Sequence, residues 1–172
     1  GWHHTPANTE CEVLMSEILI TEVDKDVEDA KMSELMSWKT RNVYQEVQDE
    51  GQKCISLRWV ITPKVINDKP STKARLVAKG YQEQKDFRTD SPTCSRESIR
   101  LLFVTTATMG WTLEAIDIQA AFLQGSQIDR EVFVKPPKEA QTAGIWKLLK
   151  CVYGLADAPR KFYLRLRDEL IN

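Results

Sequence analysis

Asp117 is a carboxylate within an apolar run that otherwise reads as a buried strand turning into a short helix. The run covers residues 111–125 and has the sequence WTLEAIDIQAAFLQG. Burying a lone charge is unfavourable unless the charge is paired or binds a metal. Asp117 therefore fits two structures, a metal ligand at a strand end or a strand-end residue that caps the next turn through its own backbone. The run alone leaves both open.

Length and composition favour one globular domain. The chain has 172 residues, of which 42% are hydrophobic, and this is enough for a sizeable core. No apolar run reaches the ~18 residues of a membrane span, so no membrane association is expected. The four cysteines form no Cys-x-x-Cys pair, which argues against a zinc site and a disulfide scaffold. A reducing intracellular compartment is the default expectation, without separating cytoplasm from nucleus.

The net charge of −1 hides an uneven distribution. Residues 1–57 carry five basic and 12 acidic side chains, whereas residues 58–100 carry ten basic and five acidic ones. The basic middle section suggests a polyanion as partner. We interpret residues 1–29 as an acidic, loosely ordered arm and residues 30–172 as the folded domain.

The periodicity of apolar residues predicts the elements of this domain. A helix is expected from about residue 30, and residues 55–66 and 73–78 alternate like an antiparallel hairpin with a basic face. A second helix is expected over residues 96–109, between a Ser95 cap and Gly110, with its apolar side facing the core. That side consists of Ile99, Leu102, Phe103 and Thr106. Further strands are expected around Asp117 and over 131–135 and 145–152, and a last helix from about Pro159.

Five separated segments match one family in order and spacing. They are residues 59–60 (WV), 73–80 (KARLVAKG), 90–93 (DSPT), 116–125 (IDIQAAFLQG) and 152–160 (VYGLADAPR). Together they resemble the reverse transcriptase, an RNA-directed DNA polymerase, of copia-type long-terminal-repeat retrotransposons. The resemblance covers about residues 30–172.

This resemblance implies an α+β fold of the right-hand polymerase type, with an antiparallel sheet and packed helices. The fingers would comprise residues 30–110 and 126–152, and the palm residues 111–125 and 153–172. The partners implied are an RNA or DNA template with its primer and a deoxynucleoside triphosphate.

The resemblance also assigns roles to single residues. Asp117 matches the first catalytic carboxylate, which would bind Mg²⁺ together with the backbone carbonyl of Ile118. Two metal ions about 4 Å apart serve such nucleotidyl transfer, and hard oxygen ligands suit Mg²⁺. Arg75 resembles the arginine that holds the triphosphate. Lys73 and Lys79 would contact either the triphosphate or the template.

Three further residues would line the substrate. Phe122 matches the position that blocks a ribose 2′-hydroxyl, although core packing explains a phenylalanine there equally well. Tyr153 and Gly154 match the segment beside the nucleotide and the template strand. Without the resemblance, Tyr153 and Gly154 would be interpreted as an ordinary turn.

One departure from the family pattern limits the expected activity. The family places a Tyr-x-Asp-Asp turn downstream of the segment that matches residues 152–160, but no Asp-Asp pair occurs in this chain. We therefore expect the chain to be inactive alone and to require the remaining palm and thumb of a parent polyprotein. The alternative is a non-catalytic remnant that binds nucleic acid or another protein. We also expect the isolated chain to be poorly soluble or to self-associate.

Overall fold

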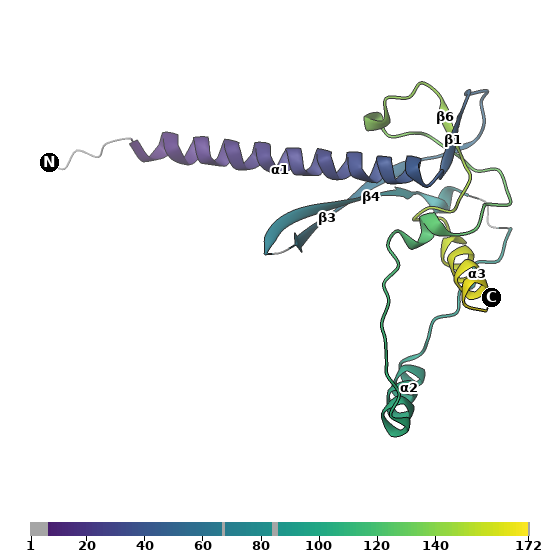
Figure 1. Ribbon diagram of the computed structural model, residues 1–172. Coiled ribbons are helices and arrows are strands. Elements are labelled where there is room, and N and C mark those ends of the chain that lie inside the picture. Colours follow the sequence, from purple (N-terminus) through teal and green to yellow (C-terminus); the bar gives the residue numbers. More distant parts are fainter. Residues whose placement is uncertain (1–6, 67, 84–85, 172) are drawn as a thin grey trace.

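The computed structural model describes residues 7–66, 68–83 and 86–171, with side chains described for 24–65, 68–83 and 86–171. Within these ranges three α-helices and two sheets form a mixed α and β architecture (Figure 1). The long helix α1 (Ala7–Thr40) lies along a two-stranded hairpin and ends beside a four-stranded sheet. None of the described helices is long and apolar enough to cross a membrane.

Helix α1 is much longer than expected. It begins at Ala7, whereas the sequence pattern predicted a helix from about residue 30, and it runs across the predicted boundary between arm and domain. No glycine or proline occurs between Ala7 and Thr40, so nothing in the local sequence interrupts the helix once it has formed. Residues 1–6 of the predicted arm lie outside the described residues.

The four-stranded sheet has the order β1-β6-β5-β2. Its strands are β1 (Tyr44–Val47), β6 (Ile145–Leu148), β5 (Phe133–Val134) and β2 (Cys54–Ile55). Strand β6 is antiparallel to both neighbours, but β2 and β5 are parallel, so the expectation of an antiparallel sheet is wrong for this pair. A parallel pair requires a long crossover, which the hairpin and α2 between β2 and β5 provide.

The hairpin agrees with its prediction. Strand β3 (Leu57–Ile66) pairs antiparallel with β4 (Lys69–Ala78) along the full length of both. Alternate residues of β4 differ in burial as a period of two requires: Ala74 and Leu76 are buried, whereas Lys73 is exposed and Arg75 half-buried.

An aromatic cluster at the end of α1 anchors the helix to the sheet. The rings of Tyr44 and Trp146 are stacked with centroids 3.9 Å apart, and the Trp38 ring lies 6.1 Å from Trp146. Trp38 and Trp146 are fully buried. Such aromatic packing adds to the stabilisation from burial alone. The fully buried large side chains of the surrounding core are Val43, Leu76, Leu123, Val134, Leu148, Cys151 and Val152.

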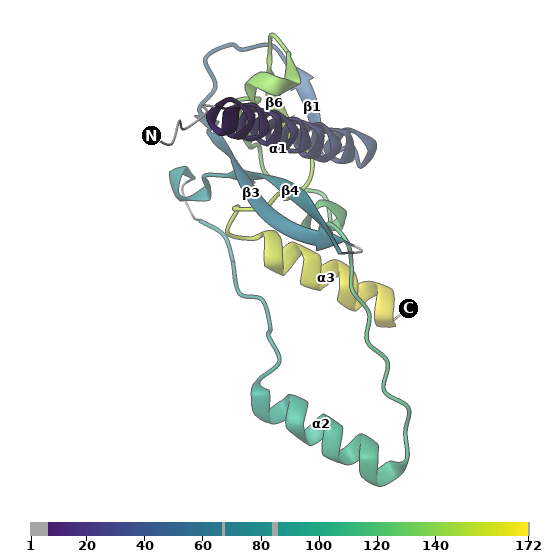
Figure 2. The ribbon, with the colours of Figure 1, turned by 90° about the vertical axis from the view of Figure 1, so that its left-hand side faces the viewer.

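Helix α2 (Arg96–Met109) has the predicted bounds but not the predicted surroundings. The Ser95 side chain accepts the N–H of Ser98, and Gly110 ends the helix with φ +65°, as expected. Figure 2 shows α2 standing away from the body at the end of two extended segments. The prediction of a core-facing side is wrong for Ile99, Leu102 and Phe103, which are exposed, whereas Thr106 is buried as expected. A helical pattern of apolar residues indicates which side of the helix should be buried, but not which element packs against that side.

The predicted strand around Asp117 is absent. Residues 111–118 have no regular structure, and no neighbouring strand pairs with them within the described ranges. The short helix expected after them is present as η2 (Ala121–Gln124). Helix α3 (Ala158–Ile171) begins one residue before Pro159 and packs against η2. Two further short helices, η1 (Gly80–Gln82) and η3 (Lys138–Ala140), complete the chain.

Candidate active site

One cleft, about 650 Å³ in volume, gathers most of the predicted site residues. Helix α1 forms one wall, the hairpin forms a second, and the segment that follows Asp117 closes the third side together with Tyr153. The lining side chains with polar or charged groups are Ser33, Glu34, Ser37, Arg41, Lys64, Thr72, Lys73, Arg75, Asp117, Gln119 and Tyr153. Predicted residues far apart in the sequence therefore share one cleft.

The cleft carries an excess of positive charge. Lys73 and Arg75 project from the same face of β4, Lys64 comes from β3, and Arg41 follows the last residue of α1. In the described part of the chain, none of these four side chains forms an ion pair. Cations that lack carboxylate partners attract an anionic ligand, and low-dielectric walls strengthen that attraction.

Two carboxylates line the same cleft in different environments. Glu34 is held in place, since its Oε1 accepts hydrogen bonds from Trp38 Nε1 at 3.1 Å and from the Leu76 amide at 3.4 Å. Asp117 is exposed. Within the described residues the Asp117 side chain accepts no hydrogen bond from the following turn, and the N-cap of η2 is Ala120, so the capping alternative for Asp117 finds no support.

The described residues supply at most part of a metal site. They contain no group of three His, Cys, Asp or Glu side chains that could hold a metal ion. The Asp117 carboxylate and the Ile118 carbonyl are hard oxygen donors, the kind that Mg²⁺ prefers, but octahedral coordination needs more ligands than these two. Further oxygens would have to come from substrate phosphates, water or additional carboxylates.

Tyr153 joins the cleft to the packing beneath it. The Arg75 guanidinium lies 5.9 Å from the centre of the Tyr153 ring, and the Phe122 ring lies 5.2 Å from it. Burial, followed by the nearby Glu34 carboxylate, raises the pKa of the Tyr153 hydroxyl, so this group stays protonated at neutral pH.

Three predicted residues, Phe122, Lys79 and Gly154, do not line the main cleft. Phe122 packs beneath it against Tyr153 and Phe162, an arrangement that fits the core-packing alternative. Gly154 lines a separate pocket of about 280 Å³, together with Arg58, Lys79 and Tyr81. The roles assigned to all of these residues stay predictions.

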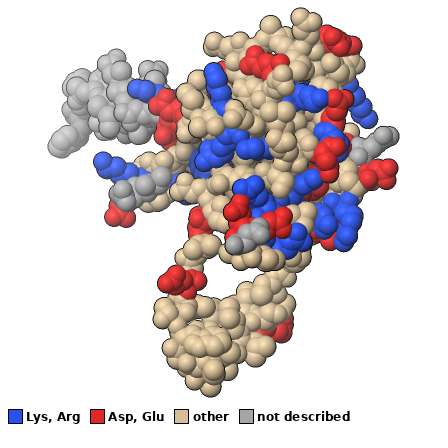
Figure 3. Space-filling model, turned by 45° about the vertical axis from the view of Figure 1, so that its right-hand side comes forward, with Lys and Arg blue, Asp and Glu red and all other residues tan. Residues whose placement is uncertain are grey.

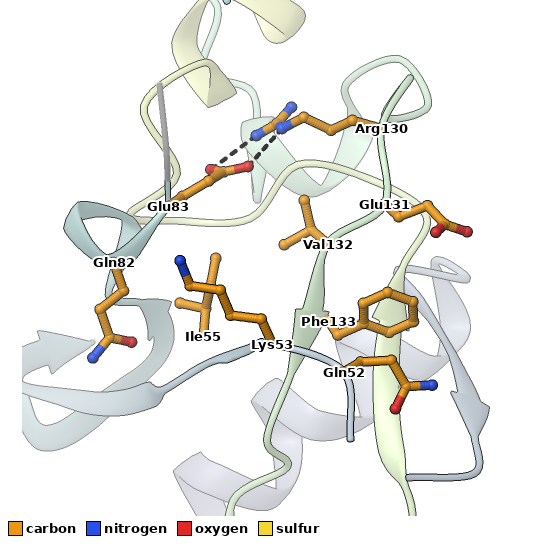
Figure 4. A pocket seen from close by; sticks show the side chains of 9 residues that line it. All are labelled: Gln52, Lys53, Ile55, Gln82, Glu83, Arg130, Glu131, Val132 and Phe133. Atoms are coloured by element: carbon orange, nitrogen blue, oxygen red, sulfur yellow. Dashed lines mark hydrogen bonds and ion pairs between the residues drawn. The ribbon is translucent and has the colours of Figure 1, made fainter. Parts of the chain in front are cut away.

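A second cavity, of about 400 Å³, lies beside a partly buried ion cluster that was not predicted from the sequence (Figure 4). Arg130 donates to Glu83 from Nε at 2.6 Å and from Nη2 at 3.0 Å. The same guanidinium donates to Asp157 from Nη1 at 2.5 Å, and Asp157 is only 3% exposed. The cluster connects the end of η1, the chain before β5 and the turn before α3. No periodic pattern marks residues that meet across such distances in sequence.

The sequence analysis also missed the wall formed by α1. Glu34, Ser37 and Arg41 face the cleft, whereas Leu35 packs against the core. The available signal was the polar side of this helix, opposite to the side that carries Met32, Leu35 and Met36.

Comparison with known proteins supports the same family as the sequence motifs. Residues 41–172 match the family described as "Reverse transcriptase (RNA-dependent DNA polymerase)". The chain belongs to this reverse transcriptase family. The resemblance seen in the sequence is thereby confirmed. No solved structure matches the chain.

Three curated relatives are transposon polyproteins. The chain is 34% identical over 126 residues to the Retrovirus-related Pol polyproteins from transposons RE1 and RE2 of Arabidopsis thaliana, which covers 69% of this chain and 9% of each relative. It is 31% identical over 146 residues to the Retrovirus-related Pol polyprotein from transposon TNT 1-94 of Nicotiana tabacum, covering 79% of the chain and 11% of the relative. The chain thus spans about a tenth of the length of these relatives.

The reverse transcriptase family has characteristic ligands. The family generally uses Mg²⁺, and its partners are a nucleic-acid template and deoxynucleoside triphosphates. The match begins at residue 41, so all of α1, including the residues that line the cleft, lies before the matched region, whereas Arg41 is its first residue.

Proposed function

We propose that this chain contains the nucleotide-binding part of an RNA-directed DNA polymerase, with its cleft as the site for a deoxynucleoside triphosphate. One observation carries the proposal: the cleft places the cations Lys73 and Arg75 on one wall and the carboxylate Asp117 on another. Phosphoryl transfer requires this combination, because cations bind the phosphates and oxygen ligands bind the metal. The hairpin then belongs to the fingers and the Asp117 segment to the palm.

Each cleft residue has a role in this proposal. Arg75 binds triphosphate oxygens through its planar fork of donors, and Lys73 adds a point charge beside it. Asp117 and the Ile118 carbonyl would hold Mg²⁺, which, when bound, offsets negative charge on the phosphates. Tyr153 forms the floor beneath the nucleotide, held by its contacts with Arg75 and Phe122.

The chain alone is proposed to bind nucleotide but not to polymerise. Nucleotidyl transfer with two metal ions needs further carboxylates besides Asp117, and the chain contains no Asp-Asp pair. A longer polyprotein would supply them; the transposon relatives are polyproteins of which the chain spans about a tenth.

Nucleotide binding can be tested on the chain itself. Titration with dTTP, followed by calorimetry, should show binding that Lys73→Gln and Arg75→Gln each weaken about tenfold, the effect of one charge-assisted hydrogen bond. Lys69→Gln is the matched control, because Lys69 lies exposed on the same strand outside the cleft. If Lys69→Gln weakened binding as much as Arg75→Gln, the cleft would not be the site.

The catalytic role of Asp117 needs a longer polyprotein that carries this chain. In primer extension, Asp117→Asn should abolish synthesis while leaving template-primer binding intact. The control is Glu114→Gln, which removes a carboxylate three residues earlier on the same exposed segment, outside the cleft. If the Asp117→Asn variant extended primers as fast as the unsubstituted protein, the assignment of Asp117 as a catalytic carboxylate would be wrong.

A steric role for Phe122 is the least direct part of the proposal, because its ring lies beneath the cleft. Phe122→Val should raise incorporation of UTP relative to dTTP in the same extension assay, since a smaller side chain leaves room for a 2′-hydroxyl. Phe133→Val, in strand β5, is the control for lost aromatic volume away from the cleft. If Phe122→Val and Phe133→Val discriminated equally between UTP and dTTP, Phe122 would have a packing role only.

The alternative is a binding module without chemistry. The unpaired cations of the hairpin favour it, because such side chains form salt-dependent contacts with phosphates of any nucleic acid. Binding of a template-primer duplex that weakens with salt, together with no measurable dTTP binding, would favour this alternative.

A further inference from the structure

We propose that Arg41 is a phosphate-binding residue of the cleft, so that the turn at the C-terminal end of α1 forms part of the substrate site and does not only support it. This inference rests on the proposed function, since it assigns a further contact to the same nucleoside triphosphate. None of the five family-like segments includes Arg41.

The position of Arg41 is the first argument. It lines the cleft together with Lys73 and Arg75, although it comes from a different wall. The positive charges of Arg41 and Arg75 both act to lower the pKa of the Tyr153 hydroxyl, against the larger effect of burial. Both guanidinium groups therefore act on the same part of the cleft. A triphosphate between the two walls would meet an arginine on each side.

The anchoring of Arg41 is the second argument. Its Nη1 donates to the Ser37 hydroxyl at 2.6 Å, which orients the guanidinium one turn back along α1. Its carbonyl accepts from Lys150 Nζ at 2.7 Å, and the Val43 carbonyl accepts from the Leu149 amide at 2.8 Å. The backbone is therefore fixed to the four-stranded sheet, and a pre-organised side chain loses less freedom when it binds a ligand.

The charge balance is the third argument. Within the described residues Arg41 has no carboxylate partner, and of the two carboxylates in the cleft Glu34 already accepts two hydrogen bonds. Arg41 could also have a purely structural role, because a cation near the C-terminal end of a helix interacts favourably with the helix dipole. Lys39 provides the comparison: it lies in the last turn of α1 but lines a different groove, with Met36 and Tyr44.

The test measures binding of inorganic tripolyphosphate and of dTTP to the 172-residue chain. Arg41→Gln should weaken both about five- to tenfold, the range for loss of a charge-assisted contact, whereas Lys39→Gln should stay within twofold. Arg41→Lys keeps the charge but loses the fork of donors, so its affinity should lie between the two. Arg41→Lys also decides the question if Arg41→Gln fails to fold.

Three outcomes separate this inference from the proposed function. Weakening by Arg41→Gln and Arg75→Gln, but not by Lys39→Gln, supports both. Unchanged binding in Arg41→Gln and Arg41→Lys, with weakening in Arg75→Gln, overturns the role of Arg41 and leaves the proposed function intact. Unchanged binding in every variant, or no binding by the unsubstituted chain, overturns both.

Discussion

Gly80 and Gly154 pack backbone against backbone. A Cβ atom on Gly80 would overlap the Gly154 carbonyl oxygen, and a Cβ atom on Gly154 would overlap the carbonyl oxygen of Ala78. The Ala78 amide donates to the Tyr153 carbonyl at 2.7 Å beside this contact. The close approach joins the end of β4 to the turn that carries Tyr153, so it fixes two walls of the cleft relative to each other.

Gly154→Ala should destabilise the chain by about 2–4 kcal/mol, through left-handed strain and overlap with neighbouring backbone. Gly51→Ala is the matched control, because Gly51 has φ +88°, close to the +94° of Gly154, but open space around it. Gly51→Ala should be destabilised by the left-handed strain alone, by about 1–2 kcal/mol. Urea unfolding measures both values, and equal losses would mean that the backbone contact with β4 is unimportant.

Arg130→Met should destabilise the chain by about 3–5 kcal/mol, because it leaves the buried Asp157 carboxylate without its cation. Arg165→Met is the control, since Arg165 forms an exposed ion pair with Glu169 one turn along α3, worth about 0.5 kcal/mol or less. Thermal or urea unfolding compares the two. A loss of similar size in both variants would contradict a structural role for the cluster.

Cys151 should give the chain a loss of stability at alkaline pH. Burial raises the pKa of the Cys151 thiol from 9.0 to about 12. Below pH 9 the thiol is protonated in both folded and unfolded chains, but between pH 9 and about 12 only the unfolded chain releases the proton. The free energy of unfolding therefore falls as pH rises through this range.

Cys151→Ala should flatten this pH dependence, whatever its own stability at neutral pH. Urea midpoints at pH 8 and pH 10 compare the slopes of the two proteins. Alkylation provides a second readout: at pH 8 iodoacetamide should modify the exposed Cys94 and spare Cys151 in the folded chain. Parallel slopes in the two proteins would count against the raised pKa.

The isolated chain should self-associate through α2 and the segment after it. Leu101 is 66% exposed and Ile116 is 79% exposed. Figure 3 shows that the protruding lobe that contains α2 carries few charged side chains on the face in view. Apolar surfaces of this kind mark contacts with another protein or sites of aggregation. Sedimentation should show mass rising with concentration.

Leu101→Glu together with Ile116→Glu should reduce this association. Thr112→Glu is the control, because it adds charge to the same exposed region without removing an apolar side chain. A monodisperse monomer at every concentration would show that the exposed apolar surface does not drive assembly.

Local signals predicted some elements well. Ser95 and Gly110 marked the ends of α2, because a cap and a left-handed glycine act within one turn of the helix. Alternation of apolar residues identified the hairpin, whose strands are close in sequence. The resemblance identified Lys73, Arg75, Asp117, Ile118 and Tyr153 as a group, and the structure places them around one cleft.

Other features depend on partners that sequence patterns do not specify. A strand requires hydrogen bonds to a neighbour, and none of the described strands lies beside residues 111–118, so the apolar run around Asp117 stays irregular. The cluster of Arg130 with Glu83 and Asp157 likewise joins three segments through tertiary contacts alone.

The sequence by itself determined the family, the hairpin, the bounds of α2 and the residues that we propose for phosphate and metal binding, because these follow from local periodicity, caps and ordered motifs. The tertiary structure decided that α1 forms a wall of the cleft, that Arg41 lines the same cleft as Arg75, and that α2 stands exposed. Each of these depends on contacts between elements far apart in the chain, and the free energy of such contacts exists only once the elements have been brought together.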